Sequence, residues 1–286
     1  MAERILAFIP HPDDESYSFA GSIALATREG ARVRVVCASS GEAGERHDGG
    51  ASGREALRAA REAELADSCR ILGAEPPHFW RLPDGGLREA EGGVERAAAA
   101  IAVFEPDVIL TLGPDGAYGH PDHLAVYRWV TAAWEAAGRG PRLLEAVFPR
   151  GLFLPQYEKC LGMMGDPPDP SAAAIGGGPW DEERDIAAVA GLKLAAIAAH
   201  RTQLPRRGPA RALPARHRGG AALPRAIPGA LRVTRPSGRV PGRGRCAPVR
   251  CCPVAGAPRR AGGRARGHRA WSGRHRWCRI PWRVRG

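Results

Sequence analysis

Two short stretches of the sequence place histidines next to aspartates. The first, PHPDDES at residues 10–16, directly follows the apolar run RILAFI. The second, GHPDH at residues 119–123, comes soon after the apolar run DVILTLG. Neutral imidazole and carboxylate groups suit Zn²⁺, and three such ligands leave an open position for water. Together the two stretches predict a divalent metal site, with Zn²⁺ as the expected ion and an ion such as Fe²⁺ as the alternative.

The same side chains would supply the other groups that amide hydrolysis requires. A Zn²⁺ ion brings the pKa of a bound water toward about 7 and polarises a carbonyl oxygen. A carboxylate that is not committed to the metal accepts the water's proton, and a histidine protonates a leaving amine. The two stretches therefore predict metal-assisted hydrolysis of an amide.

The elements around these stretches must bring them together. Up to about residue 200, short apolar runs alternate with longer helical patterns, which predicts a three-layer, Rossmann-like α/β domain with a mostly parallel sheet. Ligands of such sheets gather outside the carboxyl ends of the strands, where both stretches are expected. Strands are predicted at residues 4–9, 31–39, 78–82, 107–113 and 143–148, and helices at 18–30, 53–72, 93–105, 123–138 and 181–203, with a short strand near 185–189 as the alternative. A loop rich in Pro and Gly is predicted at residues 165–180.

Four motifs, taken in order, carry a resemblance to a known family. HPDDES, SGEAG at residues 40–44, GAYGHPDH at 116–123 and KLAAIAAHRTQ at 193–203 resemble the LmbE-like, or PIG-L, family of zinc-dependent de-N-acetylases. The resemblance covers residues 4 to about 203. It implies removal of an N-acetyl group from an N-acetylglucosaminyl-type compound; the family includes deacetylases of N-acetylglucosaminyl-phosphatidylinositol and of the precursors of mycothiol and bacillithiol. An amidase that accepts a larger acyl group on such a sugar is the alternative.

The resemblance also implies roles for residues of the two histidine-aspartate stretches, PHPDDES and GHPDH. Carried over position by position, it makes His11, Asp14 and His123 the metal ligands. Asp13 matches the general base that takes a proton from the metal-activated water. His120 matches the histidine that stabilises the oxyanion or protonates the amine.

Four further residues receive roles in the same way. Asp122 resembles the carboxylate that orients the catalytic histidine. Arg61 and Asp84 match residues that bind the sugar or its substituent, and His200 fits a histidine near the site. Simpler roles compete with those that the resemblance implies. They are a helix cap for Asp13 and Asp14, a helix start for Asp122, pairing of Arg61 with Glu64 on a solvated helix face, a turn at Asp84 and a helix-dipole contact at His200.

The C-terminal part of the chain differs in composition from the rest. Residues 1–200 carry 19 basic and 30 acidic side chains, a net charge of −11, whereas residues 201–286 hold 23 arginines and no acid. We therefore predict two parts, a domain at residues 1–204 and a basic, low-complexity, disordered tail at 205–286. The tail suggests binding to polyanions such as nucleic acid as a rival function. Its Arg, Gly, Pro and Ala are also what an out-of-frame reading of a GC-rich gene would give, and we favour that explanation.

Other classes of protein fit the sequence less well. The first strand leads into PHPDDES and not into a G-x-G-x-x-G turn, which argues against a dinucleotide-dependent oxidoreductase. The N-terminal apolar run is too short for a signal peptide, and no stretch has transmembrane length. We expect a cytoplasmic enzyme that acts on a small amino-sugar conjugate, with no specific nucleic-acid partner and no membrane span. The sequence leaves its oligomeric state open.

Overall fold

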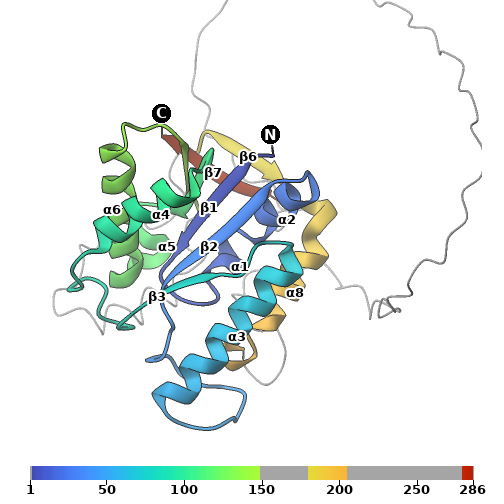
Figure 1. Ribbon diagram of the computed structural model, residues 1–286. Coiled ribbons are helices and arrows are strands. Elements are labelled where there is room, and N and C mark those ends of the chain that lie inside the picture. The colour runs from blue at the N-terminus through green and yellow to red at the C-terminus, as the bar shows by residue number, and fades with distance from the viewer. Residues whose placement is uncertain (1, 149–179, 205–278, 286) are drawn as a thin grey trace, which may run out of the picture. The chain divides into compact units, whose positions relative to one another are not determined.

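A computed structural model describes residues 2–148, 180–204 and 279–285, which all belong to one compact unit (Figure 1). Seven strands form one sheet in the order β3-β2-β1-β4-β5-β7-β6. The first five strands are parallel, and β7 runs antiparallel to both of its neighbours. The strands are β1 (Arg4–Ile9), β2 (Arg32–Ser39), β3 (His78–Leu82), β4 (Val108–Leu112), β5 (Arg142–Ala146), β6 (Glu182–Asp185) and β7 (Arg279–Arg285). The predicted α/β class with a mostly parallel sheet is confirmed.

Helices cover both faces of this sheet, which explains why its central strands are mostly apolar. One face carries α1 (Asp14–Ser18), α2 (Ala20–Arg28), α3 (Arg54–Leu72) and α8 (Ala190–Ala199), and the other carries α4 (Gly93–Phe104) and α6 (Pro121–Ala136) (Figure 1). A short helix, α5 (Gly116–Gly119), precedes α6. All five residues of β4 are buried as a consequence.

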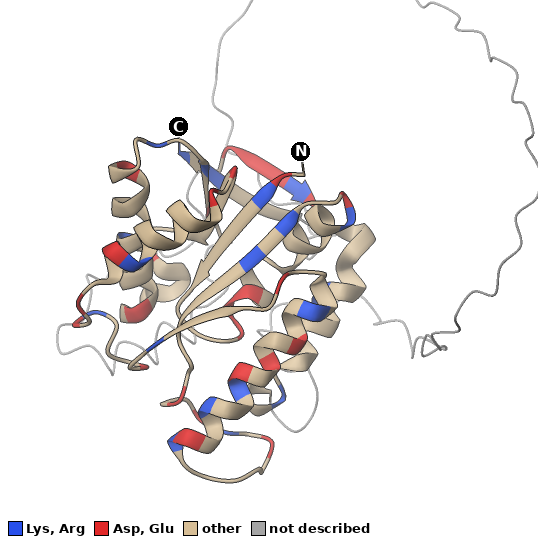
Figure 2. Cartoon of the chain, viewed as in Figure 1, with Lys and Arg blue, Asp and Glu red and all other residues tan. Residues whose placement is uncertain are grey.

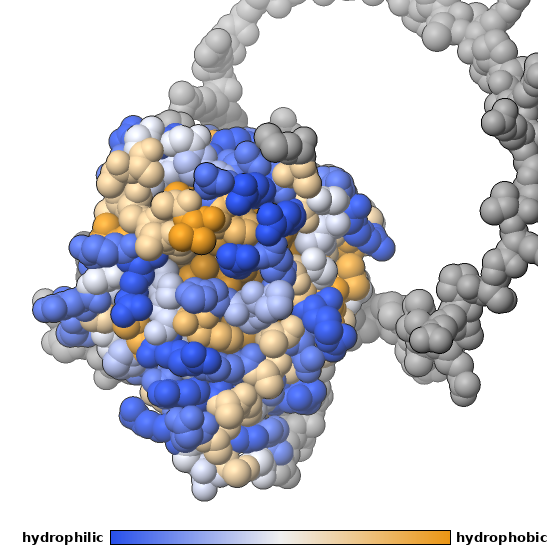
Figure 3. Space-filling model, viewed as in Figure 1, coloured by the Kyte–Doolittle hydropathy of each residue, from blue (hydrophilic) through white to orange (hydrophobic). Residues whose placement is uncertain are grey.

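The outward faces of the helices are polar. Figure 2 shows acidic and basic residues spaced along α3, as expected for a helix with one face in water. Within the described residues the exposed large hydrophobic side chains are those of Val103 and Leu194. On the face viewed in Figure 3, hydrophobic residues are interspersed with hydrophilic ones. Among the described helices, none has both the length and the apolar character that crossing a bilayer requires.

The predicted helix at residues 181–203 is wrong at its start. Residues Glu182–Asp185 form β6, followed by a 3-10 helix at Ala187–Val189, then α8, and a second 3-10 helix at Arg201–Gln203. The acids suggested the first turn of a helix, but residues 182–185 alternate between half-buried and exposed positions, as a strand with one face covered does. The strand forms because β7, nearly a hundred residues later, pairs with it.

The prediction of a disordered tail is wrong for the last residues of the chain. Residues 279–285 form β7 between β5 and β6, so the folded domain does not end at residue 204. Trp282 is fully buried and stacks on Phe19, and Arg283 and Arg285 pair with the buried Glu145. Composition could not reveal this, because the partners of these side chains lie far away in the sequence. The rest of the tail, residues 205–278, and most of the predicted loop at 165–180 lie outside the described residues.

Candidate active site

The predicted site residues lie where the parallel strands end. His11, Asp13 and Asp14 follow β1, and Asp84 follows β3. The second histidine-aspartate stretch follows β4, which is the direct neighbour of β1 in the sheet. Because parallel strands end at the same edge, the two loops meet there, as the sequence predicted. The second loop is anchored as the start of α6, with His120 as the N-cap and Pro121 at the first turn.

Two histidines and an aspartate form a buried group that would suit a metal ion. Oδ2 of Asp14 lies 3.3 Å from Nδ1 of His11 and 3.5 Å from Nε2 of His123. One ligand atom from each of the three residues lies within 4.8 Å of the others. The structure therefore brings together the three residues that the resemblance named as metal ligands. A second, overlapping group consists of His11, His120 and Asp122.

The hydrogen bonds of His123 prepare one of its nitrogens for a ligand. Nδ1 lies 3.0 Å from the carbonyl oxygen of Gly116. Because a carbonyl only accepts, Nδ1 carries the proton, and the lone pair of Nε2 is directed toward Asp14. Burial lowers the pKa of His123 to about 3, so the ring is neutral, which is the form that binds metals. The donor set and its tautomer fit a divalent ion.

Two further aspartates face the other nitrogen of His11. Nε2 of His11 lies 3.1 Å from Oδ2 of Asp122 and 3.2 Å from Oδ1 of Asp84. Burial disfavours the charged imidazole, but the hydrogen bonds to Asp122, Asp14 and Asp84 outweigh burial and raise the pKa of His11. The Asp84 side chain is 8% exposed, so it is more than the turn residue that the sequence allowed.

The contacts of Asp122 differ from the expected ones. Its carboxylate is fully buried and accepts hydrogen bonds from the amides of Gly85 (2.8 Å) and Leu87 (3.0 Å), besides its contact with His11. It meets His120 through its backbone amide, which donates to Nδ1 of that ring over 3.1 Å. The carboxylate thus orients His11 and the loop after β3, and the amide orients His120.

Asp13 stands beside the metal group in an unusual backbone conformation. Its φ of 123° is one that residues other than glycine rarely adopt, and its side chain makes no helix-capping hydrogen bond. Its carboxylate lies 3.3 Å from Nη2 of Arg61. Burial raises the pKa of Asp13 to about 6, against the opposing attraction of Arg61. A capping role, the simpler reading of Asp13, does not fit these contacts.

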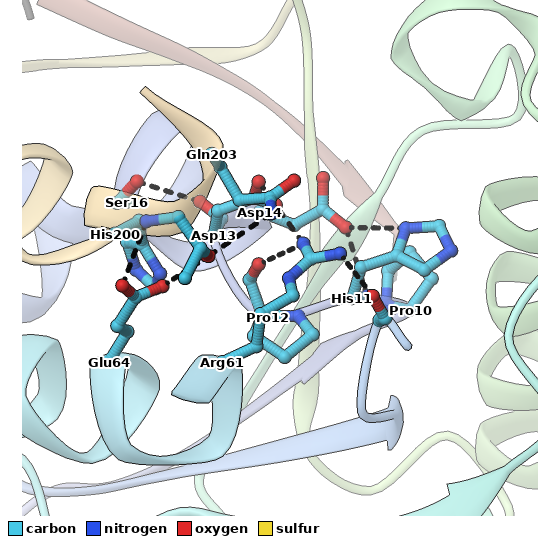
Figure 4. Close-up of polar contacts among 12 residues, drawn as sticks. Pro10, His11, Pro12, Asp13, Asp14, Ser16, Arg61, Glu64, His200 and Gln203 are labelled. Atoms are coloured by element: carbon cyan, nitrogen blue, oxygen red, sulfur yellow. Dashed lines mark hydrogen bonds and ion pairs between the residues drawn. The ribbon is translucent and has the colours of Figure 1, made fainter. Parts of the chain in front are cut away.

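Arg61 is buried and directed into the site, as Figure 4 shows. Its guanidinium donates to the carbonyl oxygens of Gly41 (2.8 Å) and Pro12 (2.5 Å) and pairs with Asp13. A Cβ atom on Gly41 would lie 2.2 Å from this guanidinium, so glycine leaves the space that Arg61 occupies. The alternative of a solvated helix face with pairing to Glu64 is therefore wrong.

His200 lies near the site but apart from the metal group. It is almost fully buried, and its Nε2 lies 2.7 Å from Oε1 of Glu15. Burial disfavours the charged ring, but the attraction of Glu15 outweighs burial and raises the pKa of His200. Its contact is thus with a carboxylate beneath the first loop. A direct role of His200 in binding substrate stays a prediction.

Sequence reasoning missed two residues of this region. Glu15 has no predicted chemical role. It lies in the first turn of α1, is fully buried and accepts hydrogen bonds from Ser68 (2.6 Å) and from the amide of Asp13 (3.1 Å). The hydroxyl of Tyr118 lies 3.3 Å from Nε2 of His123. The signal for Tyr118 was its place between glycines in GAYGH. For Glu15 it was a third consecutive acid at the end of a buried strand.

Comparisons with known proteins identify the family of this chain. The model of the PIG-L family, described as GlcNAc-PI de-N-acetylase, matches residues 6–134. A 1D-myo-inositol 2-acetamido-2-deoxy-alpha-D-glucopyranoside deacetylase from Saccharomonospora viridis is 33% identical over 224 residues, which cover 68% of this chain and 82% of that protein. The chain belongs to the PIG-L family. The resemblance seen in the sequence is confirmed.

Residues 6–134, the part of the chain that the PIG-L family model matches, contain every predicted site residue except His200. Two other relatives carry the same deacetylase name, and the chain spans about half of their length, 52%. Among solved structures, N,N'-diacetylchitobiose deacetylase from Pyrococcus horikoshii is 24% identical with a TM-score of 0.51, covering 72% of each chain. The 4-carboxy-2-hydroxymuconate hydratase from Pseudomonas putida is 24% identical with a TM-score of 0.54, covering 70% of this chain and 80% of that one. These two likenesses establish the fold alone, and the fold serves both named activities.

Proposed function

We propose that this chain is a metal-dependent hydrolase that removes the acetyl group from the nitrogen of an N-acetylglucosaminyl-type compound. The observation that carries the proposal is the buried His11, Asp14 and His123 group, together with the adjacent residue Asp13, whose carboxylate pairs with Arg61. The names of the PIG-L relatives, which act on an acetamido sugar, support the choice of substrate. An amidase for a larger acyl group on the same kind of sugar remains the alternative.

His11, Asp14 and His123 would hold the metal, for which we propose Zn²⁺. Two imidazole nitrogens and one carboxylate are donors that Zn²⁺ takes, although an ion such as Fe²⁺ accepts the same types. When bound, Zn²⁺ supplies Lewis acidity toward a carbonyl oxygen and lowers the pKa of water. Asp84 and Asp122 fix the orientation of His11 by accepting from its Nε2.

The residues beside the metal group have two tasks: Asp13 transfers the proton, and His120 stabilises the oxyanion. Asp13 accepts a proton from the water that attacks the amide carbonyl carbon, forming the new C–O bond. Because Nδ1 of His120 accepts from the Asp122 amide, Nε2 carries the proton of the neutral ring and donates to the developing oxyanion. Burial lowers the pKa of His120 and keeps this ring neutral. As the C–N bond breaks, Asp13 returns its proton to nitrogen, which leaves acetate and a free amine.

The experiment that tests this proposal is a product assay. Purified, zinc-loaded full-length protein is incubated with a panel of N-acetylglucosaminyl conjugates and with the same conjugates carrying longer acyl groups. Mass spectrometry is expected to find free amine and acetate in equal amounts from at least one acetyl compound, and none with the His123→Ala variant. Faster cleavage of the longer acyl groups would favour the amidase. Absence of free amine from the whole panel would contradict both.

The contacts of His11 lead to a prediction about metal affinity. Asp84 accepts from the His11 ring with Oδ1 and from the amide of Ala43 with Oδ2, at 2.7 Å. In Asp84→Asn an NH₂ group replaces one of the two carboxylate oxygens. Because NH₂ does not accept hydrogen bonds, either His11 or the amide of Ala43 loses its acceptor, and the orientation of His11 is no longer fixed. The affinity for Zn²⁺ is expected to fall about 10- to 100-fold, as for other residues that support a metal ligand.

Competition with a chromophoric chelator measures this affinity. Asp48→Asn is the matched control, because Asp48 pairs with Arg46 away from the His11 group. Equal zinc affinities for Asp84→Asn, Asp48→Asn and the unaltered protein would show that Asp84 does not support the metal site.

We also infer a cytoplasmic location. Cys37 and Cys69 are buried and free, as expected of a protein kept in a reducing compartment. Binding of polyanions by the basic tail remains a prediction that rests on sequence alone.

A further inference from the structure

The carboxylate of Glu15 joins the first loop to α3 and to the end of α8. Oε2 accepts from the backbone amide of Asp13 at 3.1 Å. Oε1 accepts from the hydroxyl of Ser68 on α3 at 2.6 Å and faces Nε2 of His200, at the end of α8, at 2.7 Å. Glu15, Ser68 and His200 are each at most 1% exposed. A carboxylate this deeply buried needs such donors.

The segment that carries His200 is itself fixed against α3. The amide and the hydroxyl of Thr202 donate to the two oxygens of Glu64, over 2.8 and 2.7 Å. Figure 4 shows Glu64 and His200 close together at one end of the site. His200 therefore has little freedom to move away from Glu15.

The residue that receives this support is Asp13. Its φ of 123° is costly for a residue with a side chain, so neighbouring contacts must hold it there. Its carbonyl oxygen accepts from the amide (2.9 Å) and the hydroxyl (2.7 Å) of Ser16, and its carboxylate pairs with Arg61. The amide of Asp13 has Glu15 as its partner, which completes the set of contacts.

We infer that Glu15 and His200 are positioning residues, which hold Asp13 in the backbone conformation that aims its carboxylate at the reacting water. This inference rests on the proposed function for its catalytic consequence, though not for its structural one. Glu15 acts through the Asp13 amide, and His200 acts one step further away by holding the Glu15 carboxylate. His200 thus links the segment after α8 to the general base through Glu15.

The test compares two replacements of His200, because removing Glu15 itself would leave three buried donors unpaired and endanger folding. His200→Leu removes the donor to Glu15, whereas His200→Gln retains an N–H group that can reach it. His200→Leu is expected to lower kcat about 10- to 100-fold, because small displacements of a catalytic group have effects of that size. KM and zinc content should stay unchanged, and His200→Gln should recover most of the activity. The exposed His78 provides the control variant His78→Leu.

A second readout does not depend on turnover. Hydrogen exchange of the Asp13 amide, followed residue by residue, should be about tenfold faster in His200→Leu than in His200→Gln, as expected for a locally loosened hydrogen bond. If the protein deacetylates nothing in the panel, the proposed function fails and this exchange rate alone decides the inference. If His200→Leu does not fold, Ser68→Ala replaces it, with the same two changes expected at smaller size.

Three results would overturn the inference. The first is an Asp13 amide that exchanges at the same rate in all the variants. The second is a folded, zinc-loaded His200→Leu with the kcat of the unaltered enzyme. The third is an equal loss of kcat in His200→Leu and His200→Gln together with equal loss of thermal stability, which would mark His200 as merely structural.

Discussion

Replacing Asp13 by asparagine is expected to lower kcat by about 10²- to 10⁴-fold, the range found when a general base is removed. Asparagine has nearly the same shape, and its oxygen can still accept from Arg61, so the backbone conformation at φ 123° should persist. It cannot take a proton from water. KM and zinc content should therefore change little, because His11, Asp14 and His123 are untouched.

The comparison variant is Asp67→Asn, which makes the same chemical change on the outer face of α3, where Asp67 pairs with Arg70. Steady-state kinetics on the best compound of the panel, with zinc measured in the same samples, gives the result. If Asp13→Asn keeps a kcat within a factor of about two of Asp67→Asn, another group must accept the proton, since a general base contributes far more than that. Loss of zinc together with activity would instead mark Asp13 as a support of the metal group.

The helices and strands that have a clear hydrophobic pattern in their own sequence were predictable. The helix predicted at residues 53–72 is α3 at Arg54–Leu72, and it ends at Gly73, whose φ of 75° favours glycine. The apolar runs that form β1 and β4 carry their own signal, because strands buried on both faces are apolar at nearly every position. From these strands alone, the meeting of the two histidine-aspartate stretches follows, since both leave the same edge of the sheet.

The direction of individual side chains within the site was not predictable. Spacing indicates that Asp122 stands next to His120, but the fold turns its carboxylate to His11, 111 residues away. In the same way His200 meets Glu15 across 185 residues of chain. Such contacts depend on how α8 packs on α3 and on how the loop after β3 folds, which no local pattern records.

The C-terminal strand has the largest expected effect on stability. Trp282 is fully buried against Phe19, with ring centroids 5.8 Å apart and planes 18° from parallel. Trp282→Ala removes this contact and leaves a cavity, so the free energy of unfolding should fall by about 3–5 kcal/mol. Urea denaturation followed by circular dichroism measures it. The control is Val103→Ala, an apolar truncation at a side chain that is 76% exposed, where a change within about 0.5 kcal/mol is expected.

Deleting residues 279–286 should destabilise the domain more than Trp282→Ala does, because β7 contributes more than one side chain. The deletion exposes the edges of β5 and β6, and it leaves Glu145 without Arg283 and Arg285. A buried carboxylate without a partner is strongly destabilising, whereas Glu145→Gln in the shortened chain removes the charge and should recover part of the loss.

The effect of the deletion on stability also bears on the origin of the basic tail. If the deletion left the free energy of unfolding unchanged, residues 279–285 would not belong to the folded domain, and the out-of-frame explanation would extend to the end of the chain. A large loss, partly recovered by Glu145→Gln, would mean that these last residues complete the sheet whatever the origin of the segment before them.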